Sequence, residues 1–246
     1  MCDQKKTQQG QSLVEMLIVL PLLALLIFGV LELVLAYQTR ATLNVAVFDA
    51  ARAGATANAT LAPMNDAYAR GMAPLFVRDR SMTDVFQAQA RVRGLLLLPM
   101  APAKIEIISP SRAVFDRFKA RRRIDATSRR YDVIPNDNLM WRSAAVRSIG
   151  SGDNAVKVNV QDANLLKVRA LWCHKLVVPL LDRLIHWTWA LNNPDLYTIP
   201  EAPTGDQMRC DTYADAQGGE DYYIPIVSYS VVRMQSPVLR ADLPTN

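Results

Sequence analysis

The sequence contains only two histidines and three cysteines among its 246 residues. Few imidazole and thiol groups are therefore available for metal binding or nucleophilic catalysis. The chain has no glycine-rich phosphate-binding loop and no serine nucleophile elbow. Internal repeats and low-complexity tracts are also missing. We expect a chain that is not an enzyme and carries neither a metal nor another cofactor.

The cysteines and histidines do not form a recognisable catalytic or zinc pattern. Cys173 and His174 are adjacent, and adjacent residues of a strand point to opposite faces, which disfavours an activated thiolate. Together with His186 and Cys210 they form a nominal zinc set, but the spacings match no compact ligand motif. Nucleophilic catalysis and zinc binding are therefore both disfavoured at these residues.

A long apolar run lies near the N-terminus. No charged residue occurs between Met16 and Val30, and only Glu32 interrupts the continuation to Tyr37. As a helix these residues would reach about 33 Å, enough to span a bilayer. A secretory signal peptide would have a shorter apolar core followed by a small-residue cleavage site. We therefore expect a retained membrane anchor.

Charges on either side of this run favour one orientation. Lys5 and Lys6 precede the run with only Asp3 against them, which favours a cytoplasmic N-terminus and an exported C-terminal domain. Arg40 follows the run and partly offsets this bias. Within the run, Gly29 and the alanines at 24 and 36 would permit close approach of another helix.

Glu15 stands at the start of the apolar run, where a carboxylate is costly unless it reaches headgroups or a cation. One interpretation is a solvated carboxylate at the membrane interface. The other is that Gly10, Gln11 and Glu15 resemble the type IV pilin processing site, with glycine before the cut and glutamate at the fifth mature position. That resemblance implies cleavage by a prepilin peptidase after Gly10. The new amine of Gln11 could then pair with Glu15 of a neighbouring subunit.

Further segments narrow this resemblance to one family. Residues 49–55 (Asp-Ala-Ala-Arg-Ala-Gly-Ala) resemble the segment that follows the membrane helix in TadE-like minor pseudopilins of tight-adherence (Flp, type IVc) pilus systems. Residues 161–168 and 223–237 also resemble that family. The major Flp pilin is very short and usually has tyrosine after the glutamate, whereas this longer chain has Met16. The resemblance therefore implies a minor pseudopilin.

In this family, the expected function is to help initiate or prime assembly of an adhesive pilus. The resemblance implies a single-pass inner-membrane protein with a cytoplasmic N-terminus and a periplasmic C-terminal domain. Its implied partners are the prepilin peptidase, other minor pseudopilins, the Flp pilin and the inner-membrane platform, with no nucleic acid. The assembly helix would use Glu15, Gly29 and Glu32. Two alternatives stay open: an unprocessed scaffold of the same apparatus, or an anchored adhesin or enzyme.

The expected organisation is a leader over residues 1–10, a membrane helix with its periplasmic extension over 11–60, and an α+β domain over 61–246. Alanine-rich sequence should extend the helix outward until Gly54 loosens it. The α+β domain should combine an antiparallel sheet with helices on one face. Helices are expected over 62–77, over 81–98 with Ser81 and Asp84 as an approximate capping box, and after Pro179. Strands are expected over 104–108, 157–160, 166–178 and 222–235.

Two further features concern the exported domain. Cys173 and Cys210 would lie in the oxidising periplasm, where a disulfide between them would stabilise the fold by about 4 kcal/mol; two buried free thiols are the alternative. The basic stretch from Arg112 to Arg130 includes Arg121, Arg122 and Arg123. It is either a solvated helix face and loop or a docking surface for an acidic partner or anionic lipid headgroups.

Overall fold

The computed structural model describes residues 9–79, 81–98, 101–124, 130–150, 155–178, 182–183, 204–219 and 221–245. The leader up to residue 8, His186 and most of the helix expected after Pro179 lie outside the described residues. The chain divides into two compact units. Unit 1 comprises Met1–Gln38 and His174–Ile224, and unit 2 comprises Thr39–Cys173 and Pro225–Asn246. The expected division at residues 10 and 60 concerns processing and topology, and it stays a prediction.

A single helix, α1 (Gln9–Thr56), forms the N-terminal part of the described chain. Its first half is nearly all apolar, and Pro21 lies inside it. The helix continues through Gly54, so the expectation that this glycine loosens the helix is wrong. The left-handed residues that follow are Asn58 and Ala59, with φ of 59° and 58°.

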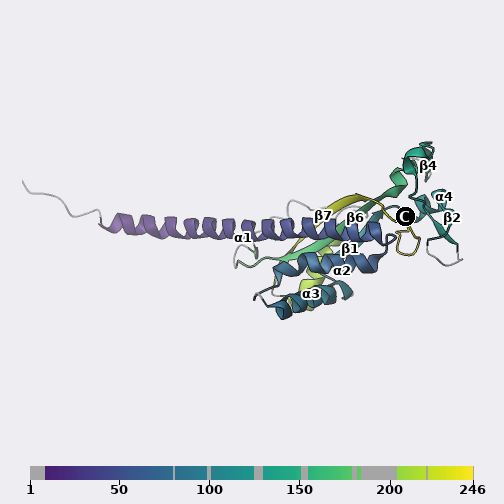
Figure 1. Cartoon of the computed structure of the whole chain (residues 1–246). Coiled ribbons are helices and arrows are strands. Elements are labelled where there is room, and N and C mark those ends of the chain that lie inside the picture. The colour runs from purple at the N-terminus through teal and green to yellow at the C-terminus, as the bar shows by residue number, and fades with distance from the viewer. Residues whose placement is uncertain are drawn as a thin grey trace, which may run out of the picture. The chain divides into compact units, whose positions relative to one another are not determined.

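Two helices of unit 2 follow α1 after a short turn. These are α2 (Leu61–Met72), which runs on into the 3-10 turn Ala73–Leu75, and α3 (Met82–Leu97). The Ser81 side chain accepts a hydrogen bond from the Asp84 amide at 3.2 Å, which confirms the expected cap. Figure 1 shows α2 alongside the second half of α1, with α3 beyond α2.

The main sheet has the strand order β1-β6-β7, from β1 (Ala103–Ser109), β6 (Leu165–Lys175) and β7 (Tyr223–Arg233). β1 pairs antiparallel with β6, with Ile105 opposite Ala170. The side chains of β6 alternate between burial and exposure over its first half, as a half-buried strand requires. The α+β class with an antiparallel sheet is thus confirmed.

The core of unit 2 lies between the second half of α1, α2 and one face of the sheet. Small side chains of α1 such as Ala46 and Ala50 are fully buried there, together with Tyr68 of α2 and Val168 of β6. Phe76 and Trp172 pack edge to face with ring centroids 5.7 Å apart. The alanine-rich second half of α1 is therefore a core helix of this unit.

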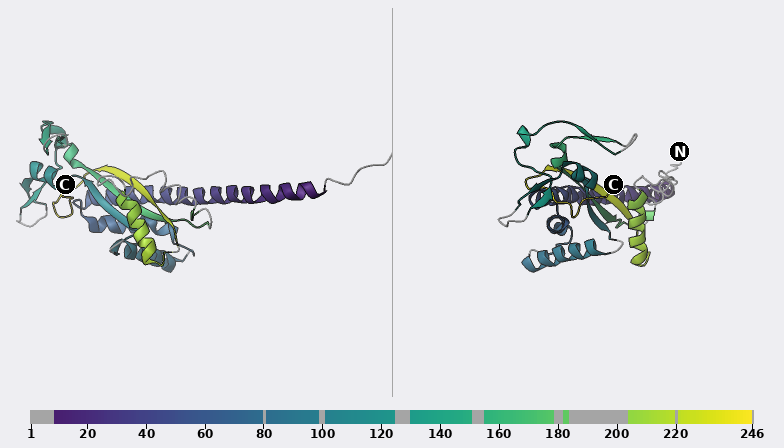
Figure 2. Two further views of the ribbon diagram at one scale, coloured as in Figure 1. Left: turned by 180° about the vertical axis from the view of Figure 1, so that it is seen from behind. Right: turned by 90° about the vertical axis from the view of Figure 1, so that its right-hand side faces the viewer.

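The rest of unit 2 consists of short elements. They are the helix α4 (Arg112–Phe118), the 3-10 turns Leu139–Trp141 and Asp162–Asn164, and two small hairpins. The hairpins pair β2 (Ala120–Arg122) with β3 (Tyr131–Val133), and β4 (Arg147–Ile149) with β5 (Val156–Val158). Both views in Figure 2 place them away from the helices α2 and α3.

Unit 1 contains the apolar half of α1, the end of β6, the helix α6 (Thr204–Ala216) and the start of β7. The Leu176 amide donates to the Tyr222 carbonyl at 2.9 Å, which continues the pairing beyond β6. Tyr213 of α6 packs edge to face on Tyr223, with ring centroids 5.4 Å apart. Gly218 and Gly219 have φ of 116° and 72° and form a turn after α6 that requires glycine.

Candidate assembly site on the N-terminal helix

The first half of α1 presents an uncovered apolar surface. Between Glu15 and Gln38, Glu32 is the only buried side chain, while Leu17, Leu26 and Leu33 are each more than half exposed. The most apolar stretch has a mean hydropathy of 2.8, and among the described residues this is the one helix long and apolar enough to cross a membrane. Such a surface requires either lipid or other apolar helices around it.

Glu32 is held by a segment distant in sequence. Its carboxylate accepts hydrogen bonds from the backbone amides of Val177, at 3.2 Å, and Val178, at 3.1 Å. His174 Nε2 lies 3.6 Å from the same carboxylate, whose side chain is only 3% exposed. All these residues belong to unit 1. Glu32 therefore ties the residues that follow β6 to α1, and we call this contact the Glu32 latch.

His174 contributes a titratable group to the Glu32 latch. Burial disfavours the charged imidazolium and lowers the pKa of His174 below its ordinary value of 6.5, although the Glu32 carboxylate partly opposes this effect. Because the folded pKa lies below the unfolded one, the unfolded segment binds more protons as the pH falls through 6.5. The contact is therefore most stable above pH 6.5 and weakens on acidification.

We expect the hydrogen-exchange protection of the Val177 and Val178 amides, corrected for intrinsic rates, to fall when the pH drops below 6.5. His174→Asn should remove most of this pH dependence because asparagine does not titrate. The measurement is hydrogen exchange of the full-length protein in detergent on either side of that pH. An equally steep pH dependence in the variant would show that another group causes it.

The structure places the remaining assembly residues along α1. Gly10 and Gln11 lie in its first turns, Glu15 is exposed, and a side chain added at Gly29 would meet no atom within 4 Å. Gly29 therefore leaves open space on the helix surface that a neighbouring helix could use. Cleavage after Gly10 and pairing of Glu15 with an amine stay predictions.

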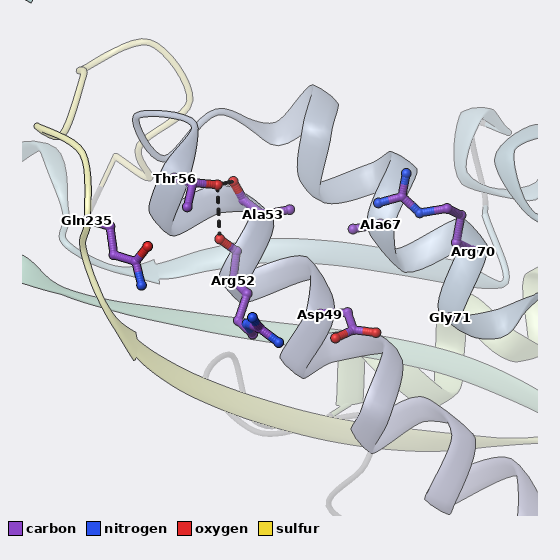
Figure 3. A pocket seen from close by; sticks show the side chains of 8 residues that line it. All are labelled: Asp49, Arg52, Ala53, Thr56, Ala67, Arg70, Gly71 and Gln235. Atoms are coloured by element: carbon purple, nitrogen blue, oxygen red, sulfur yellow. Dashed lines mark hydrogen bonds between the residues drawn. The ribbon is translucent and has the colours of Figure 1, made fainter.

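A charged cleft of about 420 Å³ lies in unit 2, between α1 and α2. Figure 3 shows Asp49 and Arg52 of α1 facing it, with Arg70 of α2 on the opposite side and Gln235 at one end. Among the described residues, no carboxylate lies within ion-pair distance of Arg52 or Arg70. The Arg52 guanidinium instead lies over the Phe48 ring, 5.8 Å from its centroid. The cleft thus offers charges of both signs to a partner.

Two glycines allow the close packing behind this cleft. A Cβ at Gly71 would lie 2.6 Å from the Ala46 Cα, so α2 approaches the α1 backbone directly. A Cβ at Gly54 would lie 2.7 Å from the Met64 sulfur. Gly54 therefore has a packing role and does not loosen the helix, because only a hydrogen atom fits between α1 and its neighbours at this position.

The cysteines and the arginine row that the sequence predicted as functional do not line the charged cleft. Cys173 and Cys210 are buried and each is disulfide-bonded. Arg121 and Arg122 lie on β2, followed by Arg123, and all three are exposed. Arg121 Nε lies 3.6 Å from Asp132. No group of three or more histidine, cysteine, aspartate or glutamate side chains arranged for a metal ion occurs within the described part of the chain.

Sequence reasoning missed the partners of Glu32 and the approach at Gly71. A lone carboxylate inside an apolar run signals that a partner exists, but its identity depends on the tertiary fold. A glycine inside a predicted helix signals a packing constraint because it otherwise costs about 1 kcal/mol relative to alanine. Neither signal identifies the residue that contacts the carboxylate or the glycine.

These features define a chain with a long, uncovered apolar helix that continues into the core of an α+β domain. Residues 10–52 match the family model of the TadE-like proteins. The match confirms the TadE-like resemblance indicated by the sequence motifs, and it ends at Arg52 in the charged cleft. TadE-like proteins are structural components associated with the tight-adherence pilus, which supports a role in its assembly. No curated protein and no solved structure matches the chain.

Proposed function

We propose that this chain is a minor pseudopilin that helps to initiate assembly of a Flp (type IVc) pilus. The observation that carries the proposal is the TadE-like match over residues 10–52, which coincides with a helix whose apolar side chains are largely exposed from Met16 to Tyr37. A prepilin peptidase would remove the leader after Gly10. The helix would then stay in the inner membrane, with the domain from residue 61 onwards in the periplasm.

The Glu32 latch supports a specific position for the membrane segment. Backbone amides of the segment beyond β6 bind Glu32, and in the proposed topology this carboxylate would lie at the periplasmic edge of the apolar segment. Glu15 precedes Glu32 by 17 residues, or about 25 Å of helix, and would lie just inside the opposite edge. A carboxylate at that depth needs a positive partner, which the new amine of Gln11 in a neighbouring subunit would supply.

The mechanism is structural. Lateral contacts between apolar helices, with close approach at Gly29, would bring the chain together with the Flp pilin and other minor pseudopilins. The charged cleft with Asp49 and Arg52 would add polar contacts to the next subunit outside the membrane. The resulting complex is the unit that the inner-membrane platform would move. No step in this mechanism requires a catalytic residue or a cofactor.

The proposal is tested by deleting the chain from its host and restoring it from a plasmid. Pili counted by electron microscopy should nearly disappear on deletion and return with the intact chain. Restoration with Glu15→Leu should give few pili, because leucine cannot pair with the new amine. A normal pilus number without the chain would contradict the proposed function.

The cysteines enter the proposal as a stabilising pair. Cys173 and Cys210 would be bonded to each other in the periplasm, which would stabilise the fold by about 4 kcal/mol for a loop of this length. Cys173→Ser and Cys210→Ser should each migrate on a nonreducing gel like the reduced intact protein. Two free thiols in the membrane-extracted protein would contradict the pairing.

A further inference from the structure

A second cleft of unit 2 is lined by residues of α4, β2, β4 and the loops near them. Figure 1 shows α4, β2 and β4 near the end of α1 that belongs to this unit. Hydrogen bonds of the C-terminal segment fix this location. The Leu239 amide donates to the Asn58 carbonyl just beyond α1, and the Arg112 amide at the start of α4 donates to the Pro244 carbonyl. We call this site the tip cleft.

The tip cleft has about 300 Å³ of space and is lined by both apolar and cationic residues. Phe118, Pro135 and Val160 contribute the apolar surface. None of the described residues that line the cleft carries a carboxylate. The cationic side chains that line it come from α4, the residue after it, a loop and β4: Arg117, Lys119, Arg142 and Arg147.

Only two of the four cations are neutralised by a neighbour. Lys119 Nζ lies 2.9 Å from Asp116, and Arg142 donates to the Asp137 carboxylate at 2.8 Å. Arg147 instead lies over the Phe118 ring, 5.6 Å from its centroid, and donates to the Arg117 carbonyl at 3.4 Å. Within the described residues, neither Arg117 nor Arg147 has a carboxylate at ion-pair distance. An anionic group entering the cleft would therefore meet two uncompensated guanidinium groups.

Two exposed apolar residues precede a cleft residue in the sequence. Met140 and Trp141, which directly precede Arg142, are 82% and 84% exposed. Tryptophan, methionine and arginine are the residues enriched in the cores of protein interfaces. Within unit 2, the cleft lies near the Thr56 end of α1, about 25 Å of helix from Thr39, where this unit begins. This location favours a protein over a lipid headgroup as the partner.

We propose that the tip cleft binds an acidic segment of a protein partner, with carboxylates between Arg117 and Arg147 and with Trp141 as an apolar anchor beside them. Guanidinium groups bind carboxylates through paired, charge-assisted hydrogen bonds. The site is thus a defined cleft, and the row Arg121–Arg123 is not among the residues that line it. The proposal is independent of the assembly role of α1.

The test measures binding of a fluorescently labelled oligo-glutamate peptide to the full-length protein in a neutral detergent. The intact protein should bind it, should not bind the matching oligo-glutamine peptide, and should bind more weakly as salt rises from about 0.01 M to about 0.15 M. Arg117→Gln combined with Arg147→Gln should weaken binding about tenfold or more. Arg147→Lys should bind more tightly than Arg147→Gln but more weakly than the intact protein, because the charge remains while the paired hydrogen bonds are lost.

Arg233→Gln is the matched control, because Arg233 is an exposed arginine of β7 outside the tip cleft. It should leave the Kd unchanged. If the double variant does not fold, Arg117→Gln alone is the test, since the Arg117 side chain has no hydrogen bond or ion pair with another described residue. Equal weakening by Arg233→Gln would overturn the proposal. So would displacement of the peptide by soluble short-chain phosphatidylglycerol or inorganic phosphate at equal concentrations, because the cleft would then be a general anion or lipid site.

Discussion

Gly71→Ala should destabilise unit 2 by about 2 to 3 kcal/mol, although alanine is normally the better helix former. A Cβ at this position would lie 2.6 Å from the Ala46 Cα and 2.7 Å from the Ala46 Cβ. The Cα is a backbone atom of α1 and the Cβ is bonded directly to it, so neither atom can move away without shifting the helix. The loss of stability therefore comes from the displacement of α2 away from α1. This displacement should also deform the charged cleft between the two helices.

Gly94→Ala is the matched control for this prediction. Gly94 is also a helical glycine, in α3, but a Cβ there would meet no atom within 4 Å. Alanine should stabilise the fold by about 0.5 to 1 kcal/mol at this position. Thermal unfolding of the full-length protein in detergent, followed by the fluorescence of the buried Trp172, measures both variants. Equal changes in Tm would show that helix propensity, and not the approach to Ala46, determines the outcome.

Glu32→Ala should release the segment after β6 from α1. The substitution leaves the Val177 and Val178 amides without the carboxylate that accepts their hydrogen bonds. Losing a buried, charged acceptor of two amides should cost about 2 kcal/mol or more, so hydrogen-exchange protection at these amides should fall about thirtyfold or more. The global unfolding of unit 2 should change little because Glu32 belongs to unit 1.

Leu33→Ala is the control for the Glu32 latch. Leu33 is the next residue of α1 and is 71% exposed, so its truncation tests the effect of changing the apolar segment without breaking the latch. Protection of Val177 and Val178 should stay within about twofold of the intact protein, as expected for a surface substitution. If Glu32→Ala has an equally small effect, the latch does not hold this segment in solution.

Much of the fold follows from local patterns in the sequence. The apolar run predicts the first half of α1, the Ser81 and Asp84 pair predicts the start of α3, and alternation predicts β1 and β6. The helix α6 was not predicted, because Asp206, Asp211 and the other polar residues of its 13 positions leave little amphipathic periodicity. The hairpins β2–β3 and β4–β5 have strands of three residues each, too short to show a period of two.

The candidate sites were predictable only in part. Glu15, Gly29 and the cysteines were identified from residue type and position along the chain. The Glu32 latch joins residues 145 positions apart, and the approach at Gly71 depends on Ala46 in another helix. Both therefore require the tertiary fold. The tip cleft combines arginines from inside and outside the basic stretch, and Arg142 and Arg147 showed no common pattern with Arg117 in the sequence.

The central claim is that this chain enters the pilin pathway, and the N-terminus of the protein extracted from membranes tests it most directly. Intact mass and N-terminal sequencing should be done with and without the cognate prepilin peptidase. The proposal predicts an N-terminus at Gln11 only when the peptidase is present, which would create the amine that Glu15 needs. An unprocessed N-terminus in both samples would contradict the proposal and would indicate a fixed membrane scaffold of the same apparatus.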